Sequence, residues 1–198
     1  MSVESARPVE WRLAALLNYG FLFLMMLVIA AILTAAMTLQ YAYGELPCPL
    51  CLLQRVALFG VCFGIMQQFR HGFSYRNSGL SMLFAIFLLI VSVRQTLLDI
   101  YPRPGHEYIG SAVFGLHMPV WSILIALALL TAFAVKFSIL GGDEKLGAVR
   151  ARAFPLLDRL ATVLCIYVIA LCMVNFVSVA LQCGLGECHT FGYTLLPK

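Results

Sequence analysis

Residues 13–39 read LAALLNYGFLFLMMLVIAAILTAAMTL, a run without a single charged side chain. An α-helix rises about 1.5 Å per residue, so a run of this length can cross a hydrocarbon core of about 30 Å. The run is much longer than the apolar segment of a secretory signal peptide, roughly 7 to 15 residues, and Glu4 and Glu10 precede it. We therefore predict an uncleaved transmembrane helix rather than a signal peptide.

The whole chain has 198 residues, of which 62% are hydrophobic and 11% charged, so its solvent is lipid. In a bilayer every backbone polar group must be paired within the protein, which leaves helices or a closed barrel. Four more apolar runs, at residues 50–69, 80–100, 119–140 and 160–182, are too long and too uniform for barrel strands. The sequence therefore predicts an all-α membrane protein, a single five-helix bundle domain over residues 1–198.

Basic residues are distributed unequally between the segments that join these helices. The first, third and fifth polar segments hold most of them: Arg7, Arg12, Arg70, Arg76, Lys145, Arg150, Arg152 and Arg159. The alternate segments hold only Arg103 and Lys198, so the positive-inside rule predicts a cytoplasmic N-terminus and a C-terminus on the outer side. The net charge is a modest +4, and the basic residues form no cluster, so nucleic acid is not expected as a partner.

The seven cysteines fall into two groups on this topology. Cys62, Cys165 and Cys172 lie within predicted helices, where free cysteines usually pack as small hydrophobic side chains. The other four form two close pairs on the outer side, in a compartment that permits disulfides: Cys48, Cys51, Cys183 and Cys188. We predict packing for the first group and redox chemistry for the second.

The pair Cys48 and Cys51 lies where the second helix is expected to begin, with Pro49 in its first turn. Helix N-terminal amides stabilise a thiolate, and the C-x-x-C spacing lets the two sulfurs close a reducible disulfide. Arg55 follows one helical turn below Cys51, where it could hold the thiolate or a quinone carbonyl oxygen. The alternative for Arg55, as for Arg94 in the third helix, is a side chain that snorkels to the interface.

Cys183 and Cys188 enclose Gly-Leu-Gly-Glu after the fifth helix, and the two glycines favour a tight turn. We favour a redox pair over a structural staple because so short a loop adds little stability. Two other interpretations remain: a haem attachment motif stretched to C-x4-C-H with His189, and a four-cysteine zinc site.

Three segments resemble the DsbB family of disulfide-bond formation proteins, in the order in which that family has them. Residues 48–55, CPLCLLQR, resemble its C-x-x-C-x-x-x-R signature. Residues 96–102, TLLDIYP, and 114–121, FGLHMPVW, also resemble the family. Together they extend the resemblance over roughly residues 13–140.

The resemblance implies a four-helix bundle in a bacterial inner membrane that oxidises a periplasmic DsbA-like thioredoxin-fold protein and reduces ubiquinone or menaquinone. Cys51 would then be the sulfur that faces the quinone, Cys48 the sulfur that exchanges with a second cysteine pair, and Arg55 the quinone contact. A partner near about −120 mV needs a more positive acceptor, which a quinone supplies.

Two features depart from the family pattern. The family generally carries its second cysteine pair between the third and fourth helices, yet residues 101–118 contain no cysteine. Instead, an added fifth helix carries Cys183 and Cys188 at its outer end, so we predict that the pair has moved there. Two alternatives remain. The fold also permits a VKOR-like protein, and the chain could instead be a non-catalytic subunit of a larger membrane complex with structural disulfides.

Overall fold

The computed structural model describes residues 7–101, 115–141, 146–147 and 149–184. These residues form five long helices, with a short 3-10 turn, η1 (Ala151–Ala153), before the last one. The long helices are α1 (Arg7–Ala42), α2 (Pro49–His71), α3 (Tyr75–Ile100), α4 (Met118–Leu140) and α6 (Pro155–Cys183). Each is long and apolar enough to cross a membrane, and the described ranges contain no strand. The predicted all-α, five-helix membrane fold is confirmed.

Prolines and glycines mark several helix ends. Pro49 stands in the first turn of α2, where a missing N–H is tolerated, and Gly72 ends that helix with a φ of 93°. Several helices are longer than their apolar runs predicted. For example, α3 begins at Tyr75 rather than residue 80, and α6 at Pro155 rather than 160, because helical hydrogen bonding continues into polar residues that a count of apolar positions leaves out.

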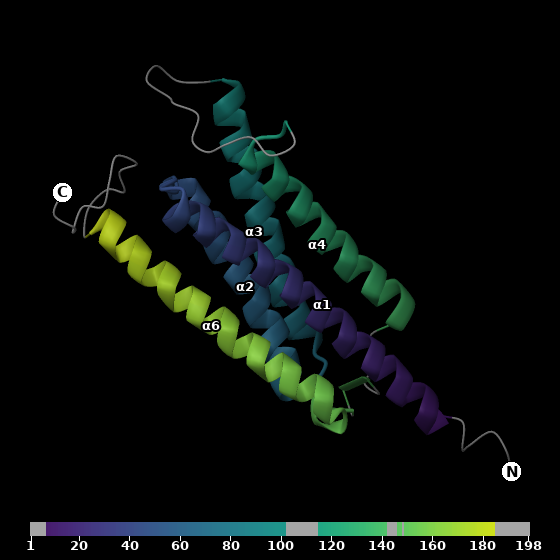
Figure 1. Ribbon diagram of the computed structural model, residues 1–198. Helices are drawn as coiled ribbons and strands as arrows, with labels where there is room; N and C mark the ends of the chain where they lie inside the picture. The colour runs from purple at the N-terminus through teal and green to yellow at the C-terminus, as the bar shows by residue number, and fades with distance from the viewer. Residues whose placement is uncertain (1–6, 102–114, 142–145, 148, 185–198) are drawn as a thin grey trace, which may run out of the picture.

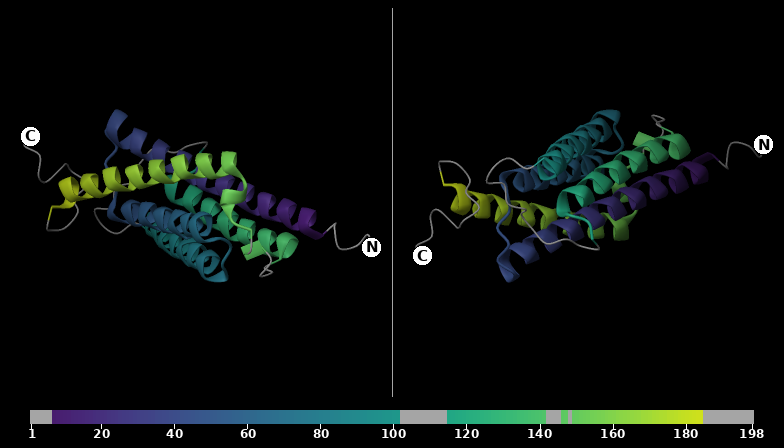
Figure 2. Two further views of the ribbon diagram at one scale, coloured as in Figure 1. Left: turned by 90° about the horizontal axis from the view of Figure 1, so that it is seen from below. Right: turned by 90° about the horizontal axis from the view of Figure 1, so that it is seen from above.

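The helices form an up-and-down bundle in which α2 and α3 are an antiparallel pair and α4 packs against α3. Helix α1 crosses the bundle in contact with α2, α4 and α6, and α6 lies against α1 and α2 (Figures 1 and 2). The end of α1, the start of α2 and the end of α6 therefore lie at the same end of the molecule (Figure 1). We call it the Cys48 end.

A close approach of backbones joins α2 to α3. A side chain at Gly64 would place its Cβ 2.7 Å from the carbonyl oxygen of Asn77, closer than atoms can lie. At the same level, the hydroxyl of Ser81 donates a 3.0 Å hydrogen bond to the carbonyl of Val61. Small residues and hydrogen bonds from hydroxyl groups hold helices together in lipid, where the hydrophobic effect does not drive one helix to associate with another.

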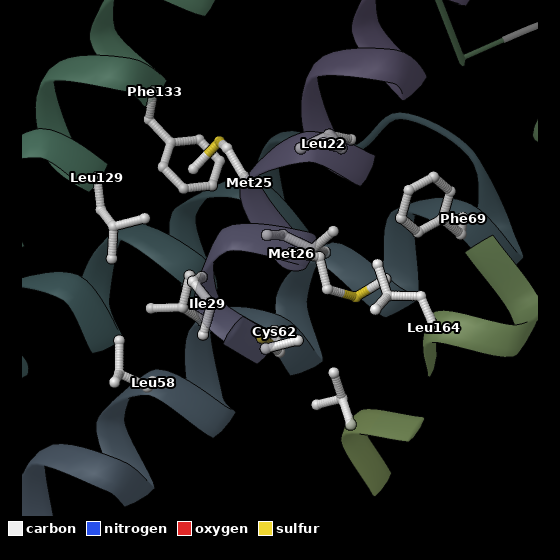
Figure 3. Packing of buried hydrophobic residues seen from close by; sticks show 14 of the residues in the cluster. Leu22, Met25, Met26, Ile29, Leu58, Cys62, Phe69, Leu129, Phe133 and Leu164 are labelled. Atoms are coloured by element: carbon white, nitrogen blue, oxygen red, sulfur yellow. The ribbon is translucent and has the colours of Figure 1, made fainter. Parts of the chain in front are cut away.

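The apolar core centres on one face of α1. Met25 and Ile29 of this helix pack toward Phe133 and Leu129 of α4, and Met26 packs toward Leu164 of α6 (Figure 3). Through these contacts α1 packs on both α4 and α6, and α6 also contacts α2 directly.

The cysteines inside the helices differ in their surroundings, although all three are free thiols. Cys62 is fully buried in the core (Figure 3), which confirms packing as its role. Cys165 is half-buried. Cys172 is exposed on the face of α6 that points away from the bundle, so the prediction of interior packing is wrong for Cys172. The error arises because a lipid-facing side of a helix is as apolar as a core-facing side.

A buried cation lies at the end of α4 farthest from the Cys48 end. Lys136 is 3% exposed, and its ammonium nitrogen lies 5.1 Å from the ring centre of Phe73 and 5.4 Å from that of Phe137. It also donates a 3.3 Å hydrogen bond to the side-chain oxygen of Gln68. The aromatic faces and the amide oxygen thus stabilise the ammonium charge of Lys136, which would be costly if it faced lipid alone.

Candidate redox site

A disulfide joins Cys48 to Cys51 at the start of α2. Cys48 is the N-cap residue: its Sγ accepts a 3.1 Å hydrogen bond from the backbone N–H of Cys51, and Pro49 follows it in the first turn. The Cα atoms lie 5.0 Å apart, within the ordinary range for a disulfide. Because the backbone N–H of Cys51 donates to this sulfur at the N-terminus of the helix, the local fold favours negative charge there after reduction.

A side chain from α3 contacts both sulfurs. The amide nitrogen of Gln95 lies 3.3 Å from Cys48 Sγ and 3.5 Å from Cys51 Sγ, in donor position to each. Gln95 is 6% exposed, so this contact is shielded from solvent. Gln95 was not among the site residues predicted from the sequence, although a buried amide in a transmembrane helix is itself a signal of function.

The orientation of Gln95 is set by two further residues. Its side-chain oxygen accepts a 2.9 Å hydrogen bond from the amide of Gln54 on α2. The oxygen of Gln54 accepts in turn from the hydroxyl of Ser122 on α4, at 3.0 Å. A chain of hydrogen bonds from Ser122 to Gln54 to Gln95 thus joins three helices, and the amide nitrogen of Gln95 at its end faces the disulfide. The Ser122 hydroxyl also lies 3.2 Å from the backbone carbonyl of Met118, a second acceptor.

Arg55 lies inside the bundle rather than at its surface. Its side chain is 8% exposed, and Nη1 donates to the side-chain oxygens of Gln40 at 2.6 Å and of Asn175 at 3.3 Å. Nη2 donates to the carbonyl oxygen of Ala36 at 3.2 Å. The guanidinium is therefore held between α1 and α6, and the alternative in which it snorkels outward does not describe this geometry.

Helix α6 supplies a second set of polar contacts at the same end. The amide of Gln40 donates to the hydroxyl of Ser178 at 2.6 Å, and the amide of Gln182 donates to the backbone carbonyl of Pro47 at 2.9 Å. None of these residues was singled out from the sequence. Their partners lie more than 130 positions away in the chain, beyond the reach of any spacing rule.

A cavity of about 450 Å³ opens beside the disulfide between α1, α2 and α4. Its lining is mainly apolar, and it includes Leu33, Leu58, Leu88, Trp121 and Ile125. Four residues add polar groups to the lining, Glu45, Gln54, Arg55 and Ser122, and Cys51 forms part of the same wall. Of the two disulfide cysteines, Cys51 is the one that lines this cavity.

The remaining predicted residues are placed as follows. Cys183 ends α6 at the Cys48 end of the bundle, is 7% exposed and is disulfide-bonded. Cys188 lies outside the described residues, as do His189 and the rest of the tail. Arg94 is exposed on α3 and lines a surface groove with Tyr101, away from the disulfide, so the structure does not bring it into the site.

The fold and the site together define a class: a multi-pass membrane protein with a disulfide at a helix N-terminus beside a cavity within the bundle. The family model "Disulfide bond formation protein DsbB" matches residues 18–107. The chain belongs to the DsbB family of disulfide bond formation proteins.

Two relatives carry the name "Disulfide bond formation protein B". The protein of Verminephrobacter eiseniae is 32% identical over 128 residues, which cover 61% of this chain and 71% of the relative. The protein of Chromohalobacter salexigens is 31% identical over 111 residues, 50% of this chain and 62% of the relative, so that match covers less than two thirds of the relative's length. No solved structure matches the chain at a comparable level. Helices α4 and α6 lie beyond the residues that the family model matches.

Proposed function

We propose that this protein is a thiol:quinone oxidoreductase that generates disulfides, reoxidises a periplasmic DsbA-like thiol oxidase and passes the electrons through Cys48 and Cys51 to a membrane quinone. The observation that carries the proposal is the cavity of about 450 Å³ whose wall contains Cys51 and the buried Arg55. The family name supports disulfide formation, and the cavity supports the choice of electron acceptor.

The chemistry of the lining fits a quinone, either ubiquinone or menaquinone. A quinone has an apolar ring with two carbonyl acceptors, and pockets for such ligands are mainly apolar with a few placed donors. Here the donor-bearing side chains are Arg55, Gln54 and Ser122, beside the aromatic Trp121. The volume lies within the range of small-molecule sites, roughly 300 to 1,000 Å³. When bound, the quinone supplies an acceptor for two electrons and two protons.

The protein's own groups prepare the two sulfurs for exchange. An incoming thiolate attacks Cys48 Sγ, the Cys48–Cys51 bond breaks, and Cys51 leaves as a thiolate beside the cavity. The side-chain amide of Gln95, which donates toward Cys51 Sγ, stabilises that charge. Over a full turnover, two thiols become one disulfide, and their two electrons and two protons pass to the quinone.

The second cysteine pair, Cys183 and Cys188, is proposed to receive electrons from the protein partner and deliver them to Cys48. Cys183 stands directly after Gln182, whose side chain is bonded to the residue before Cys48. This contact supports a relay from the end of α6 to the start of α2. In this relay the cysteine pair after α6 takes the place of a pair between α3 and α4, since residues 101–118 contain no cysteine.

The same proposal locates the protein in a bacterial inner membrane, with the Cys48 end on the periplasmic side. The distribution of lysine and arginine supports this orientation, since the segments at the Cys48 end contain few of them. The DsbA-like partner would then meet the end of the bundle at which Cys48, Cys51 and Cys183 lie.

The experiment is a turnover assay on purified protein in detergent. A small dithiol and a water-soluble quinone analogue are added, and the absorbance of the quinone is followed. We expect quinone reduction that depends on protein and on dithiol. No turnover with either class of quinone would exclude the proposal.

A further inference from the structure

One face of α6 is polar and buried, although the rest of the helix suits lipid. Asn175, Ser178 and Gln182 are 4%, 3% and 0% exposed, whereas Phe176 and Val177 are 68% and 51% exposed. Positions spaced by three and four residues lie on one side of a helix, so the three polar residues form a single row. Polar groups buried at membrane depth are costly unless they are bonded, and they commonly mark functional sites.

The first residue of this row contacts Arg55 directly. Asn175 Oδ1 accepts a hydrogen bond from Arg55 Nη1 at 3.3 Å. The acceptor is a neutral oxygen and the donor is charged, a pairing that is stronger than one between two neutral groups. Arg55 belongs to α2 and lines the cavity, so Asn175 connects the added helix to the wall of the proposed quinone site.

The second residue acts on Arg55 through Gln40. A guanidinium has donors only, so Gln40 must present its oxygen to Arg55, as the 2.6 Å contact shows. The amide nitrogen of Gln40 then faces the opposite way, where the hydroxyl of Ser178 accepts from it at 2.6 Å. The guanidinium thus decides which end of the Gln40 amide meets it, and Ser178 holds that amide in place by accepting from its nitrogen.

We propose that Asn175 and Ser178 are positioning residues of the quinone site, so that α6 holds the Arg55 guanidinium in place for the quinone and is part of the electron-transfer machinery. This inference rests on the proposed function. An arginine side chain has several rotatable bonds, and ordering it before the ligand arrives lowers the cost of binding. Removal of an α6 acceptor should therefore weaken quinone binding and leave reduction of the disulfide by a small dithiol unchanged.

The test uses the full chain with the substitution Asn175→Leu, which keeps the size of the side chain and removes its acceptor. Quinone affinity is measured without turnover, by quenching of Trp121 fluorescence with a water-soluble quinone analogue, in a Trp11→Phe background that leaves Trp121 as the sole tryptophan. We expect Kd and KM for the quinone to rise roughly ten-fold, with kcat changed much less. Ser178→Ala should raise both in the same direction by a smaller factor.

Three variants separate positioning from a merely structural effect. Asn175→Asp keeps an oxygen acceptor toward Arg55 and should keep the quinone Kd near that of the wild type. Asn175→Leu has a similar size without the acceptor, so a role in packing alone would leave the two variants alike. Val177→Leu, on the exposed side of the same helix, should match the wild type. In an Arg55→Met background, Asn175→Leu should weaken binding no further, because the group on which Asn175 acts is gone.

The outcomes distinguish the inference from the proposal beneath it. If the wild type reduces quinone and Asn175→Leu leaves Kd and KM unchanged, α6 does not position Arg55, and the inference is wrong. If Asn175→Asp weakens binding as much as Asn175→Leu, or Asn175→Leu weakens binding equally without Arg55, the residue has a packing role and the inference is also wrong. A wild-type protein that neither binds nor reduces quinone overturns the proposed function and this inference with it.

Discussion

The side-chain amide of Gln182 donates a 2.9 Å hydrogen bond to the backbone carbonyl of Pro47, and so joins the end of α6 to the start of α2. Gln182 is fully buried and directly precedes Cys183, while Pro47 directly precedes Cys48. One contact thus links two segments that each carry a disulfide-bonded cysteine. If electrons pass between these pairs, this bond helps to hold them in register.

The substitution Gln182→Leu tests that role. It removes a buried hydrogen bond that is worth about 1 kcal/mol and leaves the Pro47 carbonyl without this donor. We expect oxidation of a DsbA-like protein to slow by roughly five-fold, because each 1.4 kcal/mol corresponds to a factor of ten, while a small dithiol that reaches Cys48 directly should be oxidised as before. Val177→Leu is the control on the same helix. Equal slowing with both reductants would contradict a role in the relay.

Replacement of either Cys48 or Cys51 by Ala should abolish quinone reduction. Each variant lacks one sulfur, so neither can close the disulfide. The bundle should remain folded because each substitution removes a single sulfur atom at the end of one helix and leaves the apolar core unchanged. Quinone absorbance reports the activity, and circular dichroism with thermal unfolding reports the fold. Substantial quinone reduction by a folded Cys51→Ala protein would show that electrons take another route.

The replacement Arg55→Ala should act on quinone affinity rather than on the sulfurs. The guanidinium lines the cavity, so its loss removes a donor for the quinone, and the apparent KM for the quinone should rise more than ten-fold. Reduction of the Cys48–Cys51 disulfide by a small dithiol, measured without quinone, should be unchanged. An unaltered KM would mean that the buried guanidinium serves the fold alone.

The fold could be predicted because lipid imposes a simple rule on length. Five apolar runs of sufficient length gave five helices, and Pro49 beside the C-x-x-C motif gave the start of α2. Two features could not be predicted in the same way. The first is which face of each helix points into the bundle, because the face toward lipid and the face toward the core are both apolar. For this reason Cys172 was expected to be buried but is exposed.

The second feature is the network of hydrogen bonds around Arg55 and the disulfide, which could not be predicted from the sequence for a different reason. Spacing rules relate residues one or two turns apart on one helix, as with Cys51 and Arg55. The contacts that surround Arg55 and the disulfide instead join distant helices, such as Gln40 to Ser178 and Gln54 to Gln95. A useful signal was nevertheless present: a glutamine or asparagine within a transmembrane helix needs a partner, and several of them at one end predict a shared site.

The substitution Gln95→Leu should shift the redox potential of the Cys48–Cys51 pair. The amide of Gln95 donates toward both sulfurs and stabilises negative charge after reduction, so its loss should make the disulfide harder to reduce. A charge-assisted hydrogen bond of roughly 1.5 to 3 kcal/mol corresponds to a potential about 30 to 60 mV more negative. Equilibration with dithiothreitol buffers and thiol trapping measures it, with Val93→Leu as the control. An unchanged potential would mean that Gln95 only fills space.

The conversion of Cys183 and Cys188 together to Ser should separate two activities. If these cysteines are the partner-facing pair, the double variant cannot accept electrons from a DsbA-like protein, so that oxidation should stop. A small dithiol that reaches Cys48 directly should still reduce quinone, because Cys48, Cys51 and the cavity are untouched. Both rates are measured on the same preparation by thiol trapping of the partner and by quinone absorbance.

Single substitutions of the same pair should trap the intermediate of the relay. Exchange proceeds through a mixed disulfide, so in a variant with only Cys183 or only Cys188 the remaining tail thiolate should attack Cys48 Sγ and release Cys51 as a thiolate. The second tail sulfur that would complete the transfer is absent, so the only internal resolution is the return attack by Cys51, and an acid quench should capture the linkage. Mass spectrometry of the non-reduced protein after proteolysis would identify the linkage. The link should disappear in a Cys48→Ala background. It should also be absent in a Cys51→Ala background, because a lone Cys48 thiol and a lone tail thiol have no disulfide between them to exchange with. If the double serine variant oxidises its protein partner at the wild-type rate, the pair at the end of α6 is a structural disulfide, and electrons enter at Cys48 without it.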